Sequence, residues 1–212
     1  MPPLWKTESS LAGKSAAVGV DEAGRGALAG PVVAAAYMFL REKIEIPGLD
    51  DSKKLTRTRR EDLFQLLTNG KVGRWGVGEA SIEEIEKHNI LVASQIAMGR
   101  ALEALGDVEG VVLVDGLPAK HLGREHVAVK GGDGKCPSIA AASIVAKVSR
   151  DRTLLRFGEL YPVYGFSSNC GYGTAKHLRA LQDHGPCPIH RRSFLPVGSA
   201  TLPGLDEHAK RR

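Results

Sequence analysis

The feature that most constrains the fold of this 212-residue chain is a pair of short apolar segments that run directly into acidic residues. Residues 16–20 end at Asp21 and Glu22, and residues 111–114 end at Asp115. Short apolar runs bounded by glycine are typical of buried β-strands, and segments with helical patterns separate these two. The sequence therefore predicts an α/β domain whose central sheet carries carboxylates at its strand ends.

The other strands and the helices are predicted from alternation and from capping signals. Further strands are expected over residues 31–40, 71–78 and 125–130. Helix starts are expected at Thr58, Ser81, Asn89, Pro137 and Thr174. The helix that Asn89 opens should bury an apolar face formed by Leu91, Met98, Leu102 and Leu105. We expect one domain over residues 1–197 and a flexible tail over residues 198–212.

Composition excludes several classes of protein. Hydrophobic residues make up 42% of the chain, but no segment approaches the roughly 20 apolar residues of a membrane span. Without an apolar run of signal-peptide length near the N-terminus, we expect a cytoplasmic protein with no membrane partner. Three cysteines without C-x-x-C spacing argue against a disulfide framework and against a structural zinc site.

The charge balance is modestly positive, with 29 Lys and Arg against 24 Asp and Glu, a formal net charge of +5. This balance permits a polyanionic partner without requiring one. If several of the acids gather at a metal site, where cations neutralise them, the remaining surface is more basic. Such a surface suits binding to a phosphate backbone, with an affinity that falls as salt rises.

The acids at the strand ends are candidates for a metal site. Asp21, Glu22 and Asp115 end strands, and Asp133 lies in a glycine-rich loop before the Ala-rich helix that Pro137 opens. Ligands in open α/β sheets bind beyond the strand ends, so these acids could meet at one edge. Carboxylate oxygens favour Mg²⁺ or Mn²⁺ over zinc, and two such ions about 4 Å apart would suit phosphodiester hydrolysis.

Each acid also has a simpler interpretation. An aspartate after a strand is usually a turn former or a helix cap, and Asp133, which glycines flank, looks like an ordinary turn. Asp21 and Glu22 raise a geometric objection, because adjacent strand residues point to opposite faces. Either the strand ends between them or one of them reaches the site by another route. Spacing alone leaves the metal site undecided.

Six sequence blocks resemble, in order, those of ribonuclease HII, the type 2 ribonuclease H. They extend over nearly the whole chain, from about residue 16 to residue 196. The blocks are residues 19–32 (GVDEAGRG, then GPV), residues 51–55 (DSKKL), residues 114–116 (VDG), Asp133 with residues 137–151 (PSIAAASIVAKVSRD), residues 171–178 (GYGT, then HL), and residues 190–194 (HRRSF).

The resemblance implies a ribonuclease H-like fold, which is a central mixed β-sheet flanked by helices, with a helical C-terminal part. It implies an endoribonuclease that hydrolyses the RNA strand of RNA–DNA hybrids and cleaves 5′ of single ribonucleotides in duplex DNA. Two-metal-ion catalysis would leave 3′-OH and 5′-phosphate ends. The implied roles are ribonucleotide excision and RNA primer removal.

The family's four catalytic, metal-binding acids fall on Asp21, Glu22, Asp115 and Asp133, with Mg²⁺ or Mn²⁺ as the implied cofactor. Asp151 competes for the fourth position. Because Asp151 lies within the helix that follows Pro137, we interpret it as part of an ion pair or as a helix-face residue.

The family's substrate-binding residues fall on Gly24, Arg25 and Gly26, on Lys53 and on Tyr172. The backbone of the Gly-Arg-Gly element would read the 2′-OH, which distinguishes RNA from DNA, and glycines let the backbone approach the sugar closely. The tyrosine ring would pack under the deoxyribose that follows the ribonucleotide. Without the resemblance, Tyr172 reads as a loop aromatic that covers the core, and Lys53 as a solvated loop lysine.

The sequence also departs from the family pattern. The family often carries a basic pair before Gly171, whereas Asn169 and Cys170 stand here, which puts one phosphate contact in doubt. Because the first predicted strand begins close to the N-terminus, we expect no extra substrate-binding domain like that of ribonuclease HIII. The C-terminal residues lack the paired aromatics of a clamp-binding peptide.

Two rival functions stay open. One is a nuclease of the same fold that acts on DNA alone, which the Gly24–Gly26 element disfavours. The other is a non-catalytic module that binds RNA–DNA hybrids, which the presence of all four acids disfavours. A monomer is the expected oligomeric state.

Overall fold

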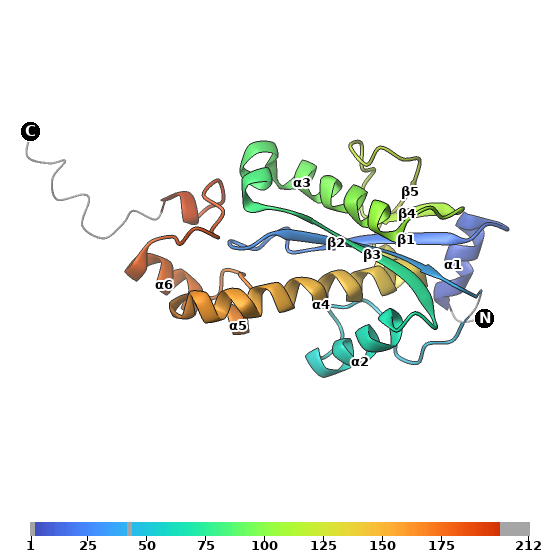
Figure 1. Cartoon of the computed structure of the whole chain (residues 1–212), viewed down its shortest axis with the longest axis horizontal. Helices are drawn as coiled ribbons and strands as arrows, with labels where there is room; N and C mark the ends of the chain where they lie inside the picture. The colour runs from blue at the N-terminus through green and yellow to red at the C-terminus, as the bar shows by residue number, and fades with distance from the viewer. Residues whose placement is uncertain (1–2, 42–43, 200–212) are drawn as a thin grey trace, which may run out of the picture.

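The computed structural model describes residues 3–41 and 44–199 of the chain, the side chains from residue 5 onward (Figure 1). Its centre is a five-stranded sheet with the order β3-β2-β1-β4-β5. β1 pairs antiparallel with β2 and parallel with β4, so the sheet is mixed. The strands are β1 (Ala17–Ala23), β2 (Val32–Phe39), β3 (Gly73–Ala80), β4 (Val111–Asp115) and β5 (Val127–Val129).

Helices cover both faces of this sheet. α3 lies on one face, and α4 lies on the other together with α2, while α5 and α6 extend beyond the end of the sheet (Figure 1). The α-helices are α1 (Pro3–Ala12), α2 (Arg57–Thr68), α3 (Ile82–Leu105), α4 (Pro137–Leu160), α5 (Phe166–Asn169) and α6 (Ala175–His184). Short 3₁₀ turns are η1 (Gly132–Gly134), η2 (Pro162–Tyr164) and η3 (Val197–Ser199). This architecture confirms the expected mixed sheet with flanking helices and a helical C-terminal part.

Alternation along β1 divides its side chains between the two helical layers. Val18 and Val20 are fully buried in the core cluster that includes α3. Gly19 faces the other layer, where an added Cβ would overlap the backbone of Ser138 at the start of α4. The glycine therefore lets α4 lie directly on β1, and Asp21, two residues further on, projects toward the same helix.

Most of the predicted helix starts are present in the structure. Ser81 caps α3 with a complete capping box, Pro137 occupies the first turn of α4, and Thr174 caps α6. Asn89 also caps a helix as predicted, because its Oδ1 accepts from the N–H groups of Leu91 and Val92. Its φ of 68° kinks α3 there and separates a first short helical segment from the rest.

Two expectations about the helices are wrong. Thr56, not Thr58, caps α2, since the Thr56 hydroxyl accepts from the N–H of Arg59. Leu91 is 51% exposed, whereas Met98, Leu102 and Leu105 are buried as expected. The kink at Asn89 explains this exposure, because it places Leu91 in the first turn of a new helical segment. α1 has no counterpart among the expected helices.

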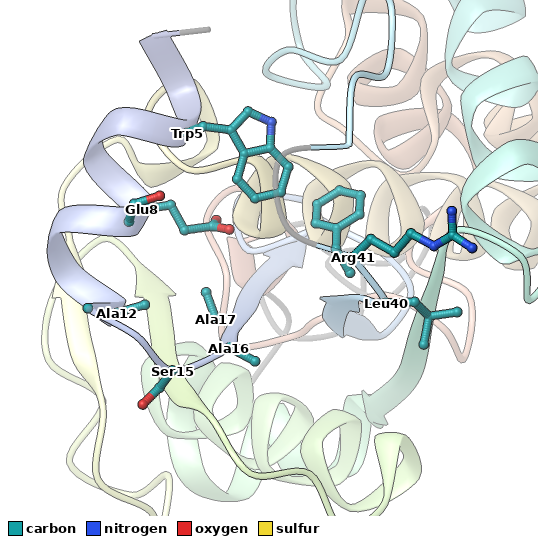
Figure 2. A pocket seen from close by; sticks show the side chains of 11 residues that line it. Trp5, Glu8, Ala12, Ser15, Ala16, Ala17, Leu40 and Arg41 are labelled. Carbon is teal, nitrogen blue, oxygen red and sulfur yellow. The ribbon is translucent and has the colours of Figure 1, made fainter. Parts of the chain in front are cut away.

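α1 packs at the start of α4, and its Glu8 is buried there (Figure 2). Glu8 Oε2 accepts from the Ser138 N–H at 2.9 Å and from the Ser138 hydroxyl at 2.5 Å. Cys136, the N-cap residue of α4, supplies no side-chain hydrogen bond. Glu8 therefore caps α4 from a different helix. Burial raises the pKa of Glu8, an effect that the Ser138 hydrogen bonds oppose.

The C-terminal part has a core cluster of its own, in which Leu28 and Ala29 pack with Tyr164, Phe166 and Leu181. The predicted tail begins inside the described region, at Gly198 in η3, while residues 200–212 lie outside the described residues. The division into residues 1–197 and a tail stays a prediction. Among the helices described, none combines the length and the apolar character needed to cross a bilayer.

Candidate active site

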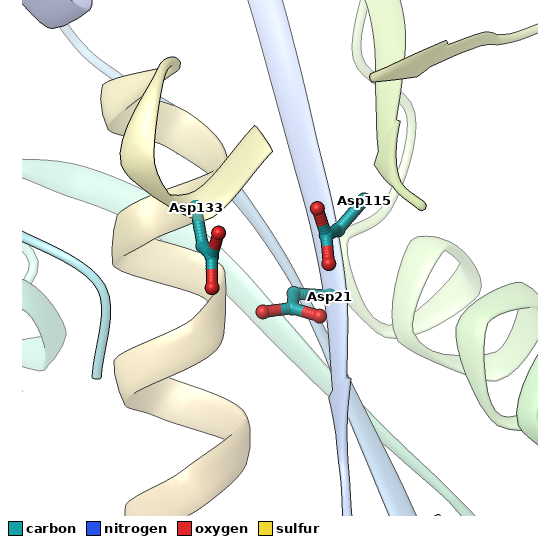
Figure 3. A group of neighbouring side chains, drawn as sticks. All are labelled: Asp21, Asp115 and Asp133. Carbon is teal, nitrogen blue, oxygen red and sulfur yellow. The ribbon is translucent and has the colours of Figure 1, made fainter. Parts of the chain in front are cut away.

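Three aspartates converge at the edge of the sheet between β1, β4 and η1 (Figure 3). Asp21 comes from β1, Asp115 is the last residue of β4, and Asp133 is the middle residue of η1. One carboxylate oxygen from each lies within 4.8 Å of the other two. The parallel pairing of β1 with β4 sets this geometry, because Val20 is paired with Val114 and both strands reach the site together.

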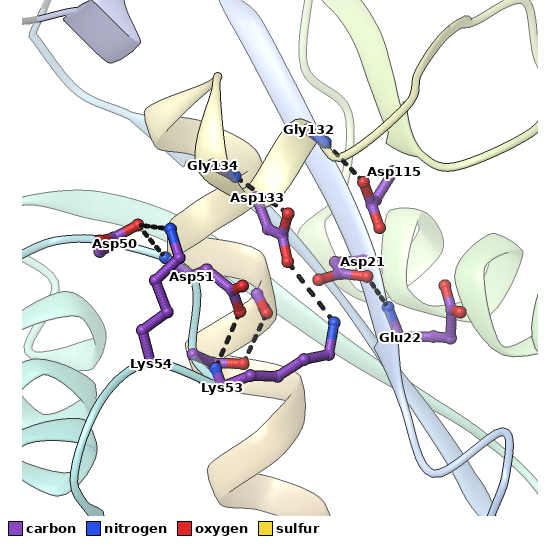
Figure 4. A network of polar contacts seen from close by, with 12 residues as sticks. Asp21, Glu22, Asp50, Asp51, Lys53, Lys54, Asp115, Gly132, Asp133 and Gly134 are labelled. Carbon is purple, nitrogen blue, oxygen red and sulfur yellow. Dashed lines mark hydrogen bonds and ion pairs between the residues drawn. The ribbon is translucent and has the colours of Figure 1, made fainter.

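Glu22 lies beside this cluster and is not one of its three members. β1 continues through Asp21 and Glu22 to Ala23, so the idea that the strand ends between the two acids is wrong. Adjacent strand residues project to opposite faces, and the Glu22 carboxylate pairs with Arg25 at 3.2 Å. Figure 4 shows the Glu22 side chain turned away from Asp133.

Backbone N–H groups hold the three aspartates in place. Asp21 Oδ1 accepts from the N–H of Glu22 at 2.7 Å. Asp115 Oδ1 accepts from the N–H of Gly132 at 2.6 Å, which ties the end of β4 to η1. Asp133 Oδ1 accepts from the N–H of Gly134 at 2.9 Å. These backbone hydrogen bonds use only one oxygen of each carboxylate, Oδ1 in all three residues.

Burial and mutual repulsion raise the pKa values in this group. The pKa of Asp21 lies well above its ordinary value, first because of burial and then because of the charges on Glu22 and Asp115. Burial also raises the pKa of Asp133, with a further contribution from Asp115. Burial raises the pKa of Glu22, while the Arg25 charge opposes the shift. Carboxylates that carry this penalty favour a cation between them.

Lys53 is the cation that approaches the cluster from the side. Its Nζ lies 3.6 Å from Asp133 Oδ2, although the side chain is largely exposed (Figure 4). Burial lowers the pKa of Lys53, but the combined attraction of the nearby aspartates, Asp21 and Asp133 first, outweighs burial and raises that pKa. The loop that carries Lys53 is held to α4 by a hydrogen bond between the hydroxyls of Ser52 and Ser143, which lie 2.8 Å apart.

The donor set fits a hard divalent cation. All three converging donors are carboxylate oxygens, and Asp21 and Asp133 are buried. Mg²⁺ and Mn²⁺ favour such ligands, whereas zinc favours histidine and cysteine. Asp21, Asp115 and Asp133 are therefore the residues that would hold a metal ion, with Glu22 at the edge of the same site.

The Gly24–Gly26 segment follows β1 directly and lies over two buried arginines. Arg150 of α4 donates from Nε to the carbonyl of Pro31 and from Nη2 to that of Ala29. Arg191 donates from Nε to the carbonyl of Gly30 and from Nη1 to that of Arg25. Both arginines are fully buried. They fix the path of the loop between β1 and β2 through its carbonyl groups.

Tyr172 follows Gly171, whose carbonyl accepts from the N–H of Leu28 just beyond this loop, and the residue is 36% exposed. The charged groups of Lys147 and Arg150 both lie 5.5 Å from the ring centre. Asp151, the competing fourth acid, pairs with Lys147 at 2.7 Å, which agrees with its interpretation as an ion-pair residue on the helix. The structure thus places Asp151 outside the group of three converging aspartates.

Several residues around the site were missed in the sequence analysis. Arg150 and Arg191 donate hydrogen bonds to carbonyls of the loop between β1 and β2. The Ser143 hydroxyl lowers the pKa of Asp21 by hydrogen bonding. One signal was available for Ser143, because it lies on the small-residue face of the Ala-rich helix. Nothing in the sequence marks the two arginines as buried, since arginine is mostly exposed.

Comparison with known proteins agrees with the observed fold. A family model described as Ribonuclease HII matches residues 18–197. A ribonuclease HII of Paraburkholderia xenovorans (strain LB400) is 52% identical over 184 residues, which are 87% of this chain and 74% of that protein. A ribonuclease HII of Sphingopyxis alaskensis is 52% identical over 185 residues, which are 87% of this chain and 91% of that protein. The solved ribonuclease H2 of Pyrococcus horikoshii OT3 has a TM-score of 0.73 and 28% identity, covering 87% of this chain and 96% of that one.

Proposed function

The chain belongs to the ribonuclease HII family, and from this premise we propose that it cleaves on the 5′ side of a ribonucleotide, within an RNA–DNA hybrid or embedded singly in duplex DNA. As a type 2 ribonuclease H it is an endoribonuclease, and enzymes of this class act on RNA–DNA hybrids. The products of the proposed reaction carry 3′-OH and 5′-phosphate ends. Ribonucleotide excision and primer removal are the proposed roles.

One observation supports this proposal above the others, namely the convergence of Asp21, Asp115 and Asp133 to within 4.8 Å. These three residues would hold Mg²⁺ or Mn²⁺, and Glu22 would complete the shell from the edge. A divalent cation held there would activate water and stabilise the charge on the leaving oxygen. The protein's part is to keep the carboxylates ionised and oriented, which the N–H groups of Glu22, Gly132 and Gly134 support.

Substrate recognition is assigned to residues around the carboxylates. The backbone of Gly24, Arg25 and Gly26 would meet the ribonucleotide and its 2′-OH. The exposed side chain of Tyr172 would pack against the next deoxyribose. Lys53 is exposed beside Asp133 and would contact a phosphate near the cleaved bond. We further propose a monomer that works in the cytoplasm.

The decisive experiment uses one DNA duplex that contains a single ribonucleotide, incubated with Mg²⁺, with Mn²⁺ or with EDTA. We expect metal-dependent cleavage 5′ of the ribonucleotide, with product ends mapped by mass spectrometry. An all-DNA duplex should stay intact. Cleavage of that duplex would favour the DNA-only nuclease, and binding of hybrids without cleavage in either metal would favour the non-catalytic module.

A further inference from the structure

A chain of hydrogen bonds between two buried histidines ends on the backbone of Tyr172. His177 of α6 and His190 are 0% and 1% exposed. His177 Nδ1 lies 2.9 Å from the carbonyl oxygen of Tyr172, and His177 Nε2 lies 2.9 Å from His190 Nε2. At the other end, His190 Nδ1 lies 3.0 Å from the backbone nitrogen of Cys187. We call this chain the histidine relay.

The two ends of the relay determine where its protons lie. A carbonyl oxygen only accepts, so His177 Nδ1 must carry a hydrogen and donate to Tyr172. A backbone N–H only donates, so His190 Nδ1 must accept from Cys187. In neutral rings the remaining nitrogens then differ, and His190 Nε2 donates to His177 Nε2. The relay therefore runs in one direction, from the Cys187 N–H to the Tyr172 carbonyl.

The surroundings keep both rings neutral. Two aromatic rings pack against them. The ring centroids of Tyr164 and His190 lie 4.7 Å apart, and those of Phe166 and His177 lie 5.3 Å apart. Burial lowers the pKa of His177, although its hydrogen bond to Tyr172 opposes the shift. Burial, with the charges of His177 and Arg192, lowers the pKa of His190 to about 4. An added proton would also place two N–H groups against each other.

The backbone at the His190 end of the relay is paired with the loop that precedes β2. Gly30 donates its N–H to the carbonyl of Ile189 at 2.9 Å, and Arg191 donates its N–H to the carbonyl of Leu28 at 2.9 Å. Ala29 and His190 form a β-bridge between these two segments. The relay thus joins the Tyr172 carbonyl to a segment that is paired with the loop carrying Gly24–Gly26.

We propose that His177 and His190 are positioning residues for substrate recognition, which set the place of Tyr172 relative to the Gly24–Gly26 loop. This inference rests on the proposed roles of Tyr172 and of that loop. A single ribonucleotide offers only one RNA–DNA junction, so its cleavage needs both elements at the right spacing. A long hybrid has a ribonucleotide at every position along its RNA strand, so its cleavage depends less on Tyr172.

Two substitutions at His177 separate positioning from stability. His177→Asn keeps a side-chain N–H near the Tyr172 carbonyl and loses the contact with His190. His177→Gln keeps a polar group near His190 and loses the donor to the Tyr172 carbonyl. Among the described residues, that carbonyl then keeps the N–H of Thr174 as its one donor. Both variants disturb the buried pair, so both should unfold at a lower temperature than the wild type.

The readout is the ratio of kcat/KM on a single-ribonucleotide duplex to kcat/KM on a long hybrid, at a temperature where circular dichroism shows each variant folded. We expect His177→Gln to lower this ratio by about tenfold and His177→Asn to leave it within about twofold of the wild type, a difference of about 1.4 kcal/mol. Equal ratios for the two variants would overturn the inference, because a merely structural role follows stability and not the partner atom.

Tyr172→Ala, measured in the same assay, distinguishes this failure from that of the proposed function. An unchanged ratio for Tyr172→Ala would mean that Tyr172 does not read the junction. If Tyr172→Ala lowers the ratio and His177→Gln leaves it unchanged, the positioning role of the relay is wrong and the proposed role of Tyr172 stands. If the His177 variants do not fold, ¹⁵N NMR of the wild-type imidazoles decides: a proton on His177 Nδ1 and on His190 Nε2 is expected, and any other pattern overturns the relay.

Discussion

Gly24 lies directly against the guanidinium group of Arg150, so that a Cβ at position 24 would overlap the arginine side chain. The φ of Gly24 is +96°, a conformation that other residues adopt only with strain. Gly26, two residues on, has open space around the position of a Cβ. The two glycines of the Gly-Arg-Gly element therefore serve different purposes, the first in folding and the second at the surface.

Gly24→Ala should destabilise the protein by about 2–4 kcal/mol, through backbone strain and overlap with Arg150. Gly26→Ala should change the free energy of unfolding by less than about 0.5 kcal/mol. It should still lower cleavage, since the methyl group would lie where we propose that the sugar approaches. Urea unfolding and single-ribonucleotide cleavage test both variants. A stable, active Gly24→Ala enzyme would contradict this account.

Asp21→Asn should lower metal-dependent cleavage by more than about 100-fold, because even residues that only support metal ligands contribute 10–100-fold. The same substitution should stabilise the metal-free protein, since it removes a charge that burial, Glu22 and Asp115 all disfavour. Each kcal/mol gained should raise Tm by about 2–4 °C. Calorimetry in EDTA measures this, and a lower Tm for Asp21→Asn would be inconsistent with the raised pKa.

The pH dependence of that stabilisation follows from the direction of the pKa shift. A carboxyl group with a raised pKa in the folded state binds protons more tightly there than in the unfolded chain, so the folded state gains stability as pH falls through the folded pKa. In EDTA, the difference in stability between Asp21→Asn and the wild type should therefore shrink as pH falls from 7 to 5. Urea midpoints at several pH values test this, and a growing difference would refute it.

Glu8→Ala should destabilise the protein by about 1–2 kcal/mol, the usual cost of removing a helix cap, because two hydrogen bonds to Ser138 are lost. Glu8→Gln keeps an acceptor without the charge that burial disfavours, so its loss should be smaller. Ser10→Ala, at an exposed position on the same helix, is the matched control. Equal stability of Glu8→Ala and Ser10→Ala in urea would rule out the capping role.

Much of the fold could be predicted because local signals and tertiary packing agree. The apolar alternation of Val18 and Val20 and the capping box at Ser81 are visible in the sequence, and both are present in the structure. The sequence alone does not decide whether Asp21 and Glu22 face the same site, because the answer depends on where β1 ends. Pairing with β2 carries the strand as far as Ala23.

Other features arise only from contacts between distant segments. Glu8 and Ser138 are 130 residues apart, and neither marks the other as a capping partner. Arg150 reads as an exposed residue on a polar turn of helix, yet it is buried because carbonyls from two loops converge on it. The three aspartates could be proposed as a group from their positions at strand ends, while their spacing required the parallel register of β1 and β4.

The continuity of β1 through its two acids limits how this protein can vary in length. β1 is paired on one side with β2, where Asp21 lies opposite Ala35, and on the other side with β4. One residue inserted into β1 before Asp21 would exchange its two faces, moving Asp21 away from α4 and replacing it with an apolar neighbour. Insertions are therefore expected in loops such as residues 116–126, whereas residues 17–23 should have a constant length in every functional variant.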